Sequence, residues 1–424
     1  MSFRFRNGIF YLSPYSDTGP GTITVDQFAD IFVNGIESAL TLSSGSWTIV
    51  VNGAVSAPTF GIPAINLVTP GPAFLSTITV GEHGEIFSGG AAIKSEHPVR
   101  IRNAGSIAGG IDSVQPNPGI VTGDGIDVII NWGTIRTGQA IDLGGGNDVF
   151  TNFKKVGNVV KQGVLDGSVD LGAGNDIFSG GNNSEAVEDG PGADRIKLGG
   201  GRDTYFGVVD GIGGTDGVDV VDGGKGVDTY DANLSAAGLG VIVNLDIAPA
   251  VFFGFPAQTA GTIFGTPVER IKNFENVFGT AGGDLVFGSA GANSLSGWVG
   301  NDSLVGLGGK DLLEGGSGED TFGYLSLKDS GPTRFTRDLI TDFEGAGNPG
   351  GDLIDLSAIN TKLGGIIILL DPNDAFTGTA GELRPIWRGE QTIVQIDKDG
   401  DKDADFSIAV EGTLVLNSSD FILL

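Results

Sequence analysis

An acidic residue or its amide recurs at every ninth position between Gly279 and Gly323. Each one ends a glycine-containing turn and is followed two places later by an apolar residue. Calcium is a hard cation that takes roughly six to eight oxygen ligands from carboxylates and backbone carbonyls. The spacing and residue types therefore predict a row of calcium sites. The five positions are Asp284, Asn293, Asp302, Asp311 and Asp320.

Glycine is required where the backbone turns with positive φ and passes close to a ligand. The glycines of these units are therefore candidate contributors to the same sites. The alternative, a metal-free repeat of Gly/Asp turns, does not need an acid at every ninth position. The candidate glycines are Gly282, Gly300, Gly309, Gly316 and Gly318.

A second array with the same pattern precedes this one. Its acids begin at Asp148 and continue through Asp176, Asp194, Asp203, Asp219 and Asp228. Glu185 departs from the pattern, and Asn183 replaces a glycine in its loop, so we expect weaker sites at Glu185 and at the neutral Asn293. The candidate glycines are Gly144, Gly146, Gly172, Gly174, Gly192, Gly199, Gly201, Gly217, Gly224 and Gly226.

The elements that position these acids follow from the apolar residues. The apolar member of each nonapeptide is the inward strand position, and two nonapeptides make one coil of 18 residues with a loop on each side. Loops 18 residues apart should therefore stack, with a cation between their acids. The expected inward residues are Val286, Leu295, Leu304, Leu313 and Phe322. The expected pairs are Asp176 with Asp194, Glu185 with Asp203, Asp284 with Asp302, Asn293 with Asp311, and Asp302 with Asp320.

These residues resemble the RTX (hemolysin-type calcium-binding) repeats of bacterial proteins secreted by the type I route. The resemblance implies a parallel β-roll with calcium between its turns, and a poorly folded chain without calcium. Phrases within residues 327–424 resemble the C-terminal secretion domain of serralysin-type metalloproteases, and Asp420 to Leu424 match that family's uncleaved export signal. The resemblance covers residues 140–424 and leaves residues 1–139 unmatched.

A looser repeat occupies the N-terminal part. Apolar residues, a polar turn, a glycine and another apolar strand position recur around Gly53, Gly84, Gly105, Gly133 and Gly163. Coils of this length suit a right-handed parallel β-helix. An ordinary β-sandwich with Asn-Gly turns is the alternative. Residues 1–37 are compatible with either a short helix or a strand–turn–strand.

The sequence thus predicts an all-β protein in which a parallel β-helix runs into calcium-binding β-rolls with a C-terminal β cap. The expected domains are a β-rich assembly or anchoring domain (1–139), a first roll (140–231), a connector or cap (232–272), a second roll (273–326) and a C-terminal cap and secretion domain (327–424). Phe252, Phe253 and Phe255 are expected to cover an open end or side of a roll.

The acidic run from Asp397 to Asp405 is a further candidate site, with Asp397, Asp399 and Asp401 as ligands. It is not an EF-hand, because its glycine stands at loop position 4 and Ile408 occupies position 12. A different type of calcium loop and a solvated hairpin turn both remain open.

Charge and composition narrow the possible functions. The net charge is −28, of which residues 1–120 carry only −3, so the acid follows the repeats. This field argues against nucleic acid as a partner. There is no cysteine, no Sec-type signal peptide is evident, and no apolar run is long enough to span a membrane. Residues 38–81 carry no charged side chain, which suits either an internal core or a surface that meets a partner.

The sequence offers little catalytic chemistry. His83 and His97 are the only histidines and do not form the zinc motif of the serralysin proteases. No nucleophile elbow, thiol or phosphate loop is present. The charged phrase from Lys94 to Arg102, which includes Glu96, His97 and Arg100, suits either polysaccharide cleavage or a salt-bridged turn.

Two hypotheses follow. The first is a secreted, calcium-dependent structural protein of the cell surface or matrix of a Gram-negative bacterium, a surface-layer or adhesion component. It would associate with itself and with the type I secretion machinery, and a cell-surface polysaccharide is a further expected partner. The second is a secreted β-helical polysaccharide lyase or epimerase that carries RTX repeats.

Overall fold

The computed structural model describes residues 2–6, 8–11, 15–18, 20–27, 29–32, 38–43, 45–59, 61–68, 75–109, 118–136, 141–207, 217–232, 240–245, 269–348 and 350–424. The chain divides into two compact units. The first comprises Met1–Phe206 with Thr215–Gly226, and the second comprises Gly207–Gly214 with Val227–Leu424.

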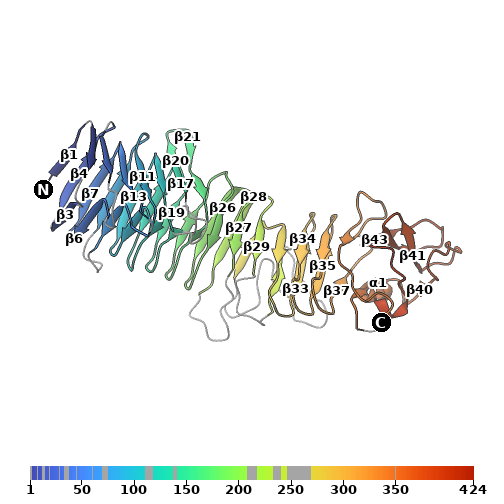
Figure 1. Cartoon of the computed structure of the whole chain (residues 1–424). Coiled ribbons are helices and arrows are strands. Elements are labelled where there is room, and N and C mark those ends of the chain that lie inside the picture. The colour runs from blue at the N-terminus through green and yellow to red at the C-terminus, as the bar shows by residue number, and fades with distance from the viewer. Residues whose placement is uncertain are drawn as a thin grey trace. The chain divides into compact units, whose positions relative to one another are not determined.

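The first unit is a stack of coils whose strands pair in parallel with those of the next coil (Figure 1). Three sheets run along the stack. The first contains β1 (Ser2–Phe5), β4 (Gly21–Val25), β7 (Trp47–Val51), β10 (Ser76–Val80), β13 (Val99–Asn103), β16 (Val128–Asn131), β19 (Val149–Thr151), β24 (Ile177–Ser179), β26 (Arg195–Gly201) and β28 (Val220–Gly226). The second contains β2 (Gly8–Tyr11), β5 (Ala29–Phe32), β8 (Ala54–Ala57), β11 (Glu85–Ser88), β14 (Ser106–Ala108), β17 (Thr134–Arg136) and β22 (Val164–Asp166). The third contains β3 (Tyr15–Thr18), β6 (Leu40–Ser43), β9 (Ile65–Leu67), β12 (Ile93–Ser95), β15 (Ile120–Val121), β18 (Ile141–Asp142), β23 (Val169–Asp170), β25 (Ala186–Glu188) and β27 (Thr204–Phe206).

One buried apolar residue per coil forms a continuous column inside the first sheet. Successive side chains of a strand point to opposite faces, so a constant pairing register keeps the same position inward in every coil. β-branched and aromatic residues suit such half-buried strands. The members of the column are Ile23, Ile49, Ile78, Ile101, Ile129, Phe150, Phe178, Ile196 and Val221.

The first unit changes from three-sided to two-sided coils after β22, the last strand of the second sheet. From there each coil has one strand in the first sheet and one in the third, so paired residues such as Ile177 and Arg195 are separated by 18 positions. The three-sided coils close one corner with a buried amide ladder. Asn103 Nδ2 donates to Asn131 Oδ1 at 2.9 Å, and Asn131 Nδ2 donates to Asn152 Oδ1 at 2.7 Å.

The amide ladder ends on a carboxylate where the second sheet ends. Asn152 Nδ2 donates to Glu185 Oε1 at 2.9 Å, and the Gly181 N–H donates to the same oxygen at 3.2 Å. The hydrogen bond to Asn152 therefore explains why a glutamate stands at a position where the repeats otherwise carry aspartate.

A hairpin interrupts the coils between β19 and β22. Strands β20 (Phe153–Val156) and β21 (Val159–Gln162) pair in antiparallel fashion and form a separate two-stranded ribbon, which stands out from the stack in Figure 1. The phrase before Gly163 was expected to supply a coil strand, and this is wrong. Residues 159–162 belong to the ribbon, whose residues are all partly or fully exposed, and β19 supplies the coil strand instead.

The N-terminal expectations can now be resolved for the described residues. The segment before residue 38 forms strands β1 to β5 and no helix in its described part. Within the uncharged stretch, inward residues such as Leu40, Trp47 and Ile49 are buried in the coil interior, which favours a core for those positions. Thr48 and Val50 lie on the outward face. Phe252, Phe253 and Phe255 lie outside the described residues, so their expected role stays a prediction.

The second unit contains a two-sided roll and a cap. One sheet contains β30 (Ile242–Asn244), β33 (Leu285–Ser289), β35 (Ser303–Leu307), β37 (Thr321–Gly323), β39 (Leu353–Asp355) and β44 (Phe421–Ile422). The other contains β29 (Thr229–Asp231), β32 (Asn276–Phe278), β34 (Ser294–Ser296), β36 (Leu312–Glu314), β38 (Leu339–Ile340), β43 (Phe406–Glu411), β42 (Gln391–Asp397), β41 (Glu382–Arg388) and β40 (Ile368–Leu369). The five inward residues expected in the second array are all buried, which confirms that part of the pattern.

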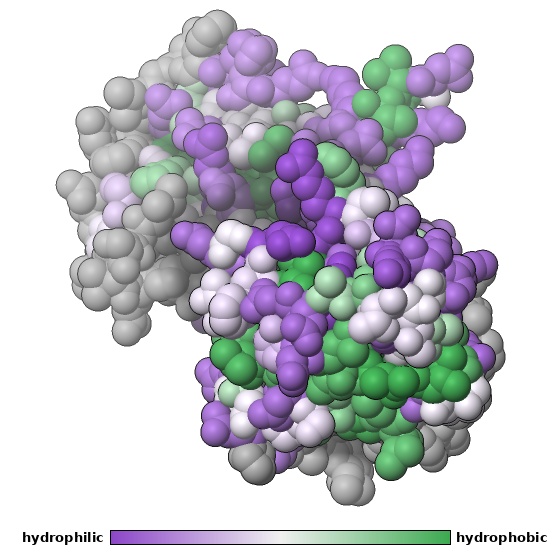
Figure 2. All heavy atoms as spheres, turned by 90° about the vertical axis from the view of Figure 1, so that its right-hand side faces the viewer, coloured by the Kyte–Doolittle hydropathy of each residue, from purple (hydrophilic) through white to green (hydrophobic). Residues whose placement is uncertain are grey.

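The cap differs from the roll because β41, β42 and β43 pair in antiparallel fashion. It also holds α1 (Ser357–Lys362) and a short 3₁₀ turn, Ser418–Asp420, while β31 (Arg270–Lys272) lies at the start of the roll. Figure 2 looks onto the C-terminal end of the view in Figure 1, and apolar side chains gather there over one face. Exposed apolar residues of this unit include Ile366, Ile368 and Trp387.

The expected fold class is confirmed: the described chain is nearly all strand, mostly in parallel sheets, and forms a β-helix and β-rolls with a β cap. Among the described residues, no helix has the length and apolar character that a membrane crossing requires.

Candidate metal centre

The acids of the first array form a ladder in which each carboxylate caps the backbone of the coil before it. Asp148 Oδ1 accepts the Asp127 N–H at 2.7 Å, Asp176 Oδ1 accepts the Asp148 N–H at 2.6 Å, and Asp194 Oδ1 accepts the Asp176 N–H at 2.5 Å. Asp219 Oδ1 continues the ladder by accepting the Asp194 N–H at 2.7 Å. One oxygen of each acid is thus fixed by the fold.

The other oxygen is left without a hydrogen bond at many of these positions. Desolvating a carboxylate without a partner is unfavourable, so such atoms are rare in stable proteins unless an ion or water meets them. This is the observation that fits the residues to a cation. The buried carboxylate oxygens without a hydrogen-bond partner among the described residues include those of Asp127, Asp148, Asp176, Glu185, Asp302, Asp311, Asp320 and Asp338.

Glycine allows the backbone of neighbouring turns to lie very close together beside the acids. Gly146 and Gly174 have φ of 144° and 155°, which side-chain-bearing residues rarely adopt. A Cβ added to Gly174 would overlap the carbonyl oxygen of Gly146. Backbone carbonyls therefore line up next to the carboxylate ladder, and together these groups supply the hard oxygen donors that calcium prefers.

Burial makes the ladder electrostatically unfavourable in the absence of a cation. It raises the pKa of Asp127, Asp148, Asp302 and Asp311 to about 7, mainly through desolvation. Neighbouring carboxylates contribute to the raised pKa of Asp148 and Asp302 as a second cause. A divalent cation would offset both effects, because it favours the charged form of every carboxylate around it.

The second array repeats this arrangement. Asp302 Oδ1 accepts the Asp284 N–H at 2.7 Å, and Asp320 Oδ1 accepts the Asp302 N–H at 2.8 Å. On the other side, Asp311 Oδ1 accepts the Asn293 N–H at 2.8 Å. Asp284 differs, because its second oxygen accepts the Thr280 N–H at 2.6 Å. Asp284 is therefore less dependent on a cation than Asp302.

The predicted separation of 18 residues between stacked loops is confirmed by hydrogen bonds and strand register. Bonds at that separation join every expected pair: Asp176 with Asp194, Glu185 with Asp203, Asp284 with Asp302, Asn293 with Asp311, and Asp302 with Asp320. The same spacing appears between β33 and β35 and between β34 and β36.

Carboxylates from three positions meet in one place in the first unit. Asp189, Asp194 and Asp219 each offer an oxygen within 4.8 Å of the others, and all three are buried. Asp189 also accepts a hydrogen bond from the buried Tyr205 hydroxyl. Asp189 was not among the candidates from sequence, because it stands outside the ninth-residue register.

The ladders extend beyond the arrays recognised from sequence. Asp127 adds a rung before Asp148, while Asp338 and Asp352 accept the N–H groups of Asp311 and Asp320 at 2.8 and 3.0 Å. These rungs were missed because longer loops separate them by 21, 27 and 32 residues. The local signal was present: Gly125, Asp127 and Ile129 repeat the spacing of Gly146, Asp148 and Phe150.

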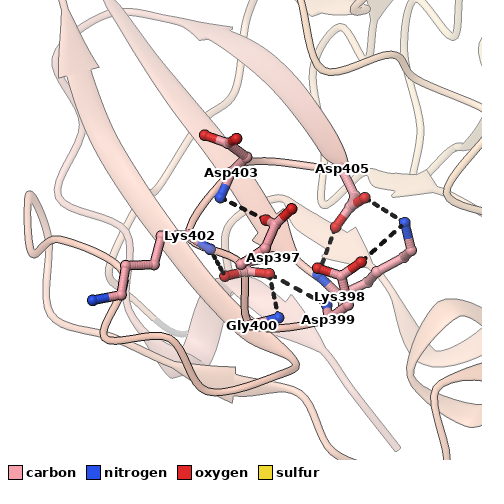
Figure 3. A network of polar contacts seen from close by, with 8 residues as sticks. Asp397, Lys398, Asp399, Gly400, Lys402, Asp403 and Asp405 are labelled. Carbon is pink, nitrogen blue, oxygen red and sulfur yellow. Dashed lines mark hydrogen bonds and ion pairs between the residues drawn. The ribbon is translucent and has the colours of Figure 1, made fainter.

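The loop after β42 gathers a different set of acids (Figure 3). Asp397, Asp399 and Asp405 lie close enough to share a cation, whereas Asp401 points its carboxylate to the Asp403 N–H at 2.9 Å. The Asp397 carboxylate is already occupied by the N–H groups of Gly400 at 2.7 Å and Lys402 at 2.9 Å. Asp405 pairs with the Lys398 ammonium at 2.5 Å. These bonds are those of a hairpin turn, and the three acids that lie together keep the loop a candidate cation site.

The charged phrase around His97 does not form one cluster. Lys94 lies on β12 in the third sheet, whereas Arg100 and Arg102 lie on β13 in the first sheet. His97 is buried, and its Nε2 bonds the Ser76 hydroxyl at 2.8 Å. The structure therefore places the lysine and the arginines on different sheets and buries the histidine in the core.

Comparisons with known proteins show which protein families the chain resembles. Residues 269–423 match the family model of the peptidase M10 serralysin C-terminal domain, and residues 179–208 match that of the RTX calcium-binding nonapeptide repeat. Among solved structures, the chain is similar to the AlgE6R3 subunit of the Azotobacter vinelandii mannuronan C5-epimerase, with 29% identity, a TM-score of 0.26, and 35% of this chain and 76% of that chain covered. The AlgE6R2 subunit of the same enzyme shows 23% identity and a TM-score of 0.20, with 32% and 91% covered. No curated protein matches the chain.

The chain therefore contains RTX calcium-binding repeats and a C-terminal domain of the serralysin type, as the sequence motifs predicted. The predicted cofactor, calcium, is confirmed by the repeat family and agrees with the acidic clusters. The protein is a calcium-binding β-roll protein whose C-terminal domain is of the kind found in type I secretion.

Proposed function

We propose that the protein is a calcium-dependent structural protein, a surface-layer, matrix or adhesion component, that folds and assembles outside a Gram-negative cell. The observation that carries this proposal is the ladder of buried carboxylates with one oxygen left for a cation. Such a ladder makes the folded state conditional on calcium, because the stacked acids repel one another when no cation lies between them.

The residues that would hold calcium are the ladder acids and the glycine turns beside them. When bound, the ion supplies positive charge and oxygen coordination, with no chemical transformation. The chain's own residues bring the carboxylates together and exclude water from them. The proposed ligands are the sequence candidates, Asp148 to Asp228 and Asp284 to Asp320, extended here by Asp127, Asp189, Asp338 and Asp352.

This dependence suits export in an unfolded form through a type I channel. Low calcium in the cytosol would keep the repeats unfolded for passage, and higher calcium outside would fold them. The segment from Asp420 to Leu424 is the proposed export signal. Residues 1–139 are the proposed assembly or anchoring domain, each roll is a rigid module, and a cell-surface polysaccharide is a further proposed ligand.

Sedimentation velocity and electron micrographs of the full chain, with calcium and with chelator, test the proposal. We expect calcium to convert an expanded monomer into folded protein that associates into sheets, filaments or closed oligomers. A folded protein that stays monomeric at high concentration in calcium and degrades an acidic polysaccharide would replace this proposal by the enzyme hypothesis.

A further inference from the structure

The β20–β21 ribbon is an insertion that adds nothing to the core of the coils. None of its residues is buried, and its tip presents Val156 and Val159 with 52% and 62% of their surface exposed. Residues 153–163 contain three lysines and no acid, although the chain as a whole carries a net charge of −28. An exposed apolar tip on a basic ribbon indicates a contact surface for a partner.

The ribbon is held in place at its base. Lys154 and Lys161 lie directly opposite each other, a pairing of like charges that is unfavourable by itself. Each has a partner on an earlier coil: Lys154 Nζ lies 3.8 Å from the centre of the Trp132 ring, and Lys161 Nζ lies 2.7 Å from Glu82 Oε1. The ribbon is therefore ordered before any partner binds, which lowers the entropic cost of docking.

The composition of the ribbon favours a protein as its partner. Aromatic residues, which anchor proteins at lipid interfaces, are absent from the tip, where Val156, Val159 and Val160 gather. Valine cannot form hydrogen bonds with a sugar. An apolar centre with charged residues around it is instead the composition of a protein–protein interface. The lysines require that the partner be acidic.

This chain presents a surface of that kind in its second unit. On the outer face of the roll sheet, Phe278 of β32 and Leu312 of β36 are 47% and 42% exposed. Glu314 is exposed on the same strand as Leu312. Phe278 and Glu314 share a register across β34, so about 10 Å separates them. On the ribbon, the exposed Val160 lies directly opposite Lys155, so an apolar residue beside a lysine there complements apolar residues beside an acid on the roll.

We propose that the β20–β21 ribbon of one copy docks on the outer face of β32, β34 and β36 of a second copy. This inference rests on the proposed structural function and names its contact. The two surfaces differ, so after one contact forms, one copy still has a free ribbon and the other still has a free roll face. Such a heterologous contact leads to an open chain or array unless its rotation closes a ring.

Two variants of the full chain test the contact. The ribbon variant carries Lys155→Glu and Val159→Asp, and the roll variant carries Phe278→Ser and Glu314→Lys. In calcium, each alone should sediment as a monomer at concentrations where the unchanged protein assembles. An equimolar mixture should form a one-to-one dimer and nothing larger, because each pair then has one intact contact and two blocked ends.

Matched controls separate the contact from misfolding. Val415→Asp changes an exposed valine of the C-terminal unit and should leave assembly unchanged. Circular dichroism of every variant in calcium should equal that of the unchanged protein. A chain carrying both Lys155→Glu and Glu314→Lys should recover at least part of the assembly that each single change removes, because the charges are exchanged across the contact.

Each contrary result has a distinct meaning. If both variants assemble like the unchanged protein, the ribbon contact is wrong while the structural function stands. If the unchanged protein is monomeric in calcium, the structural function fails, and this inference fails with it. If the ribbon variant assembles normally but loses binding to phosphatidylglycerol vesicles or heparin, the ribbon's partner is an anionic surface and the second-copy contact is overturned.

Discussion

The amide corner and the acid ladder of the first unit solve the same problem with different chemistry. At the amide corner, Asn103 and Asn131 bond to each other through amide groups that both donate and accept. In the acid ladder, the Asp176 carboxylate only accepts, so its second oxygen is left without a hydrogen bond. The comparison shows what replacing the amide nitrogen by an oxygen does. With the amide, a corner satisfies its own hydrogen bonds; with the carboxylate, it needs a cation.

Removing calcium should give the largest difference between coils with ladder acids and coils without them. With excess chelator, we expect the nonapeptide coils to lose amide protection while the coils that precede Asp127, including the coil of Asn103, keep it. We expect half-maximal refolding at about 10⁻⁴–10⁻³ M calcium, the range of extracellular modules. Hydrogen exchange and far-ultraviolet circular dichroism during a calcium titration measure both. An unchanged β signal in chelator would contradict the role given to the ladders.

Acid should partly replace calcium along the carboxylate ladders. Burial raises the pKa of Asp148 and Asp302 from 3.8 to about 7, so the folded state binds their protons more tightly than the unfolded state does. Their contribution to stability is present at low pH and is lost as the pH rises through about 7. In chelator, the folding equilibrium should improve by up to about tenfold per pH unit and per carboxyl between about pH 7 and pH 4.

The pH experiment has an internal control in the coil of β7, β8 and β9, whose residues 45–68 carry no charged side chain. Its amide protection in chelator should change little between pH 8 and pH 5, once intrinsic exchange rates are corrected. Apo nonapeptide coils that become less protected as the pH falls would show that the carboxylates are satisfied without protons or calcium.

Asp302 and Asp284 should differ in how strongly they determine calcium affinity. Asp302→Asn retains an oxygen for the Asp284 N–H but removes a charge whose second oxygen has no hydrogen bond. Asp284→Asn removes a charge from a carboxylate that Thr280 already satisfies. We expect the calcium midpoint to rise about tenfold for Asp302→Asn and only about twofold for Asp284→Asn, since affinity follows ligand charge. Equal midpoints for the two variants would refute this ranking.

The smallest effect is expected at the amide corner. Asn131→Ala leaves the Asn103 amide and the Asn152 oxygen without their mutual partner, which should lower the free energy of unfolding by about 1–3 kcal/mol. The calcium midpoint should stay unchanged, because no cation site is touched. Urea unfolding in saturating calcium measures the loss. Thr48→Ala, an outward substitution in β7, is the control and should change stability by less than about 0.5 kcal/mol.

The sequence predicted the repeating part of this molecule well because one period there sets both strand and turn. Once Asp302 and Asp320 are separated by 18 residues, the inward position of Leu304 and the stacking of the loops follow from strand geometry. The site candidates in register could therefore be named, and the structure brings the expected pairs together.

The remaining features depend on contacts that have no fixed spacing. Asp127 and Asp338 join the ladders across loops of other lengths, so the ninth-residue pattern passes over them. The amide ladder forms because Asn103 and Asn131, which are 28 residues apart, lie at the same corner of successive coils. Only the folded coil reveals this. The β20–β21 ribbon was mistaken for a coil strand, because Val159 and Val160 have the composition of a core strand although they are exposed.

The bond between the Asp127 N–H and the Asp148 carboxylate has a kinetic consequence. It lies at the start of the acid ladder, between two three-sided coils of one continuous sheet that also carry the amide corner. Starting a stack of coils is the slow step, since two strands far apart in the chain must first be brought together, whereas adding a coil to an existing edge is fast. The coils that precede Asp127 offer that edge before calcium arrives. They act as a preformed nucleus for folding, and we expect the roll to grow from that edge without a lag phase.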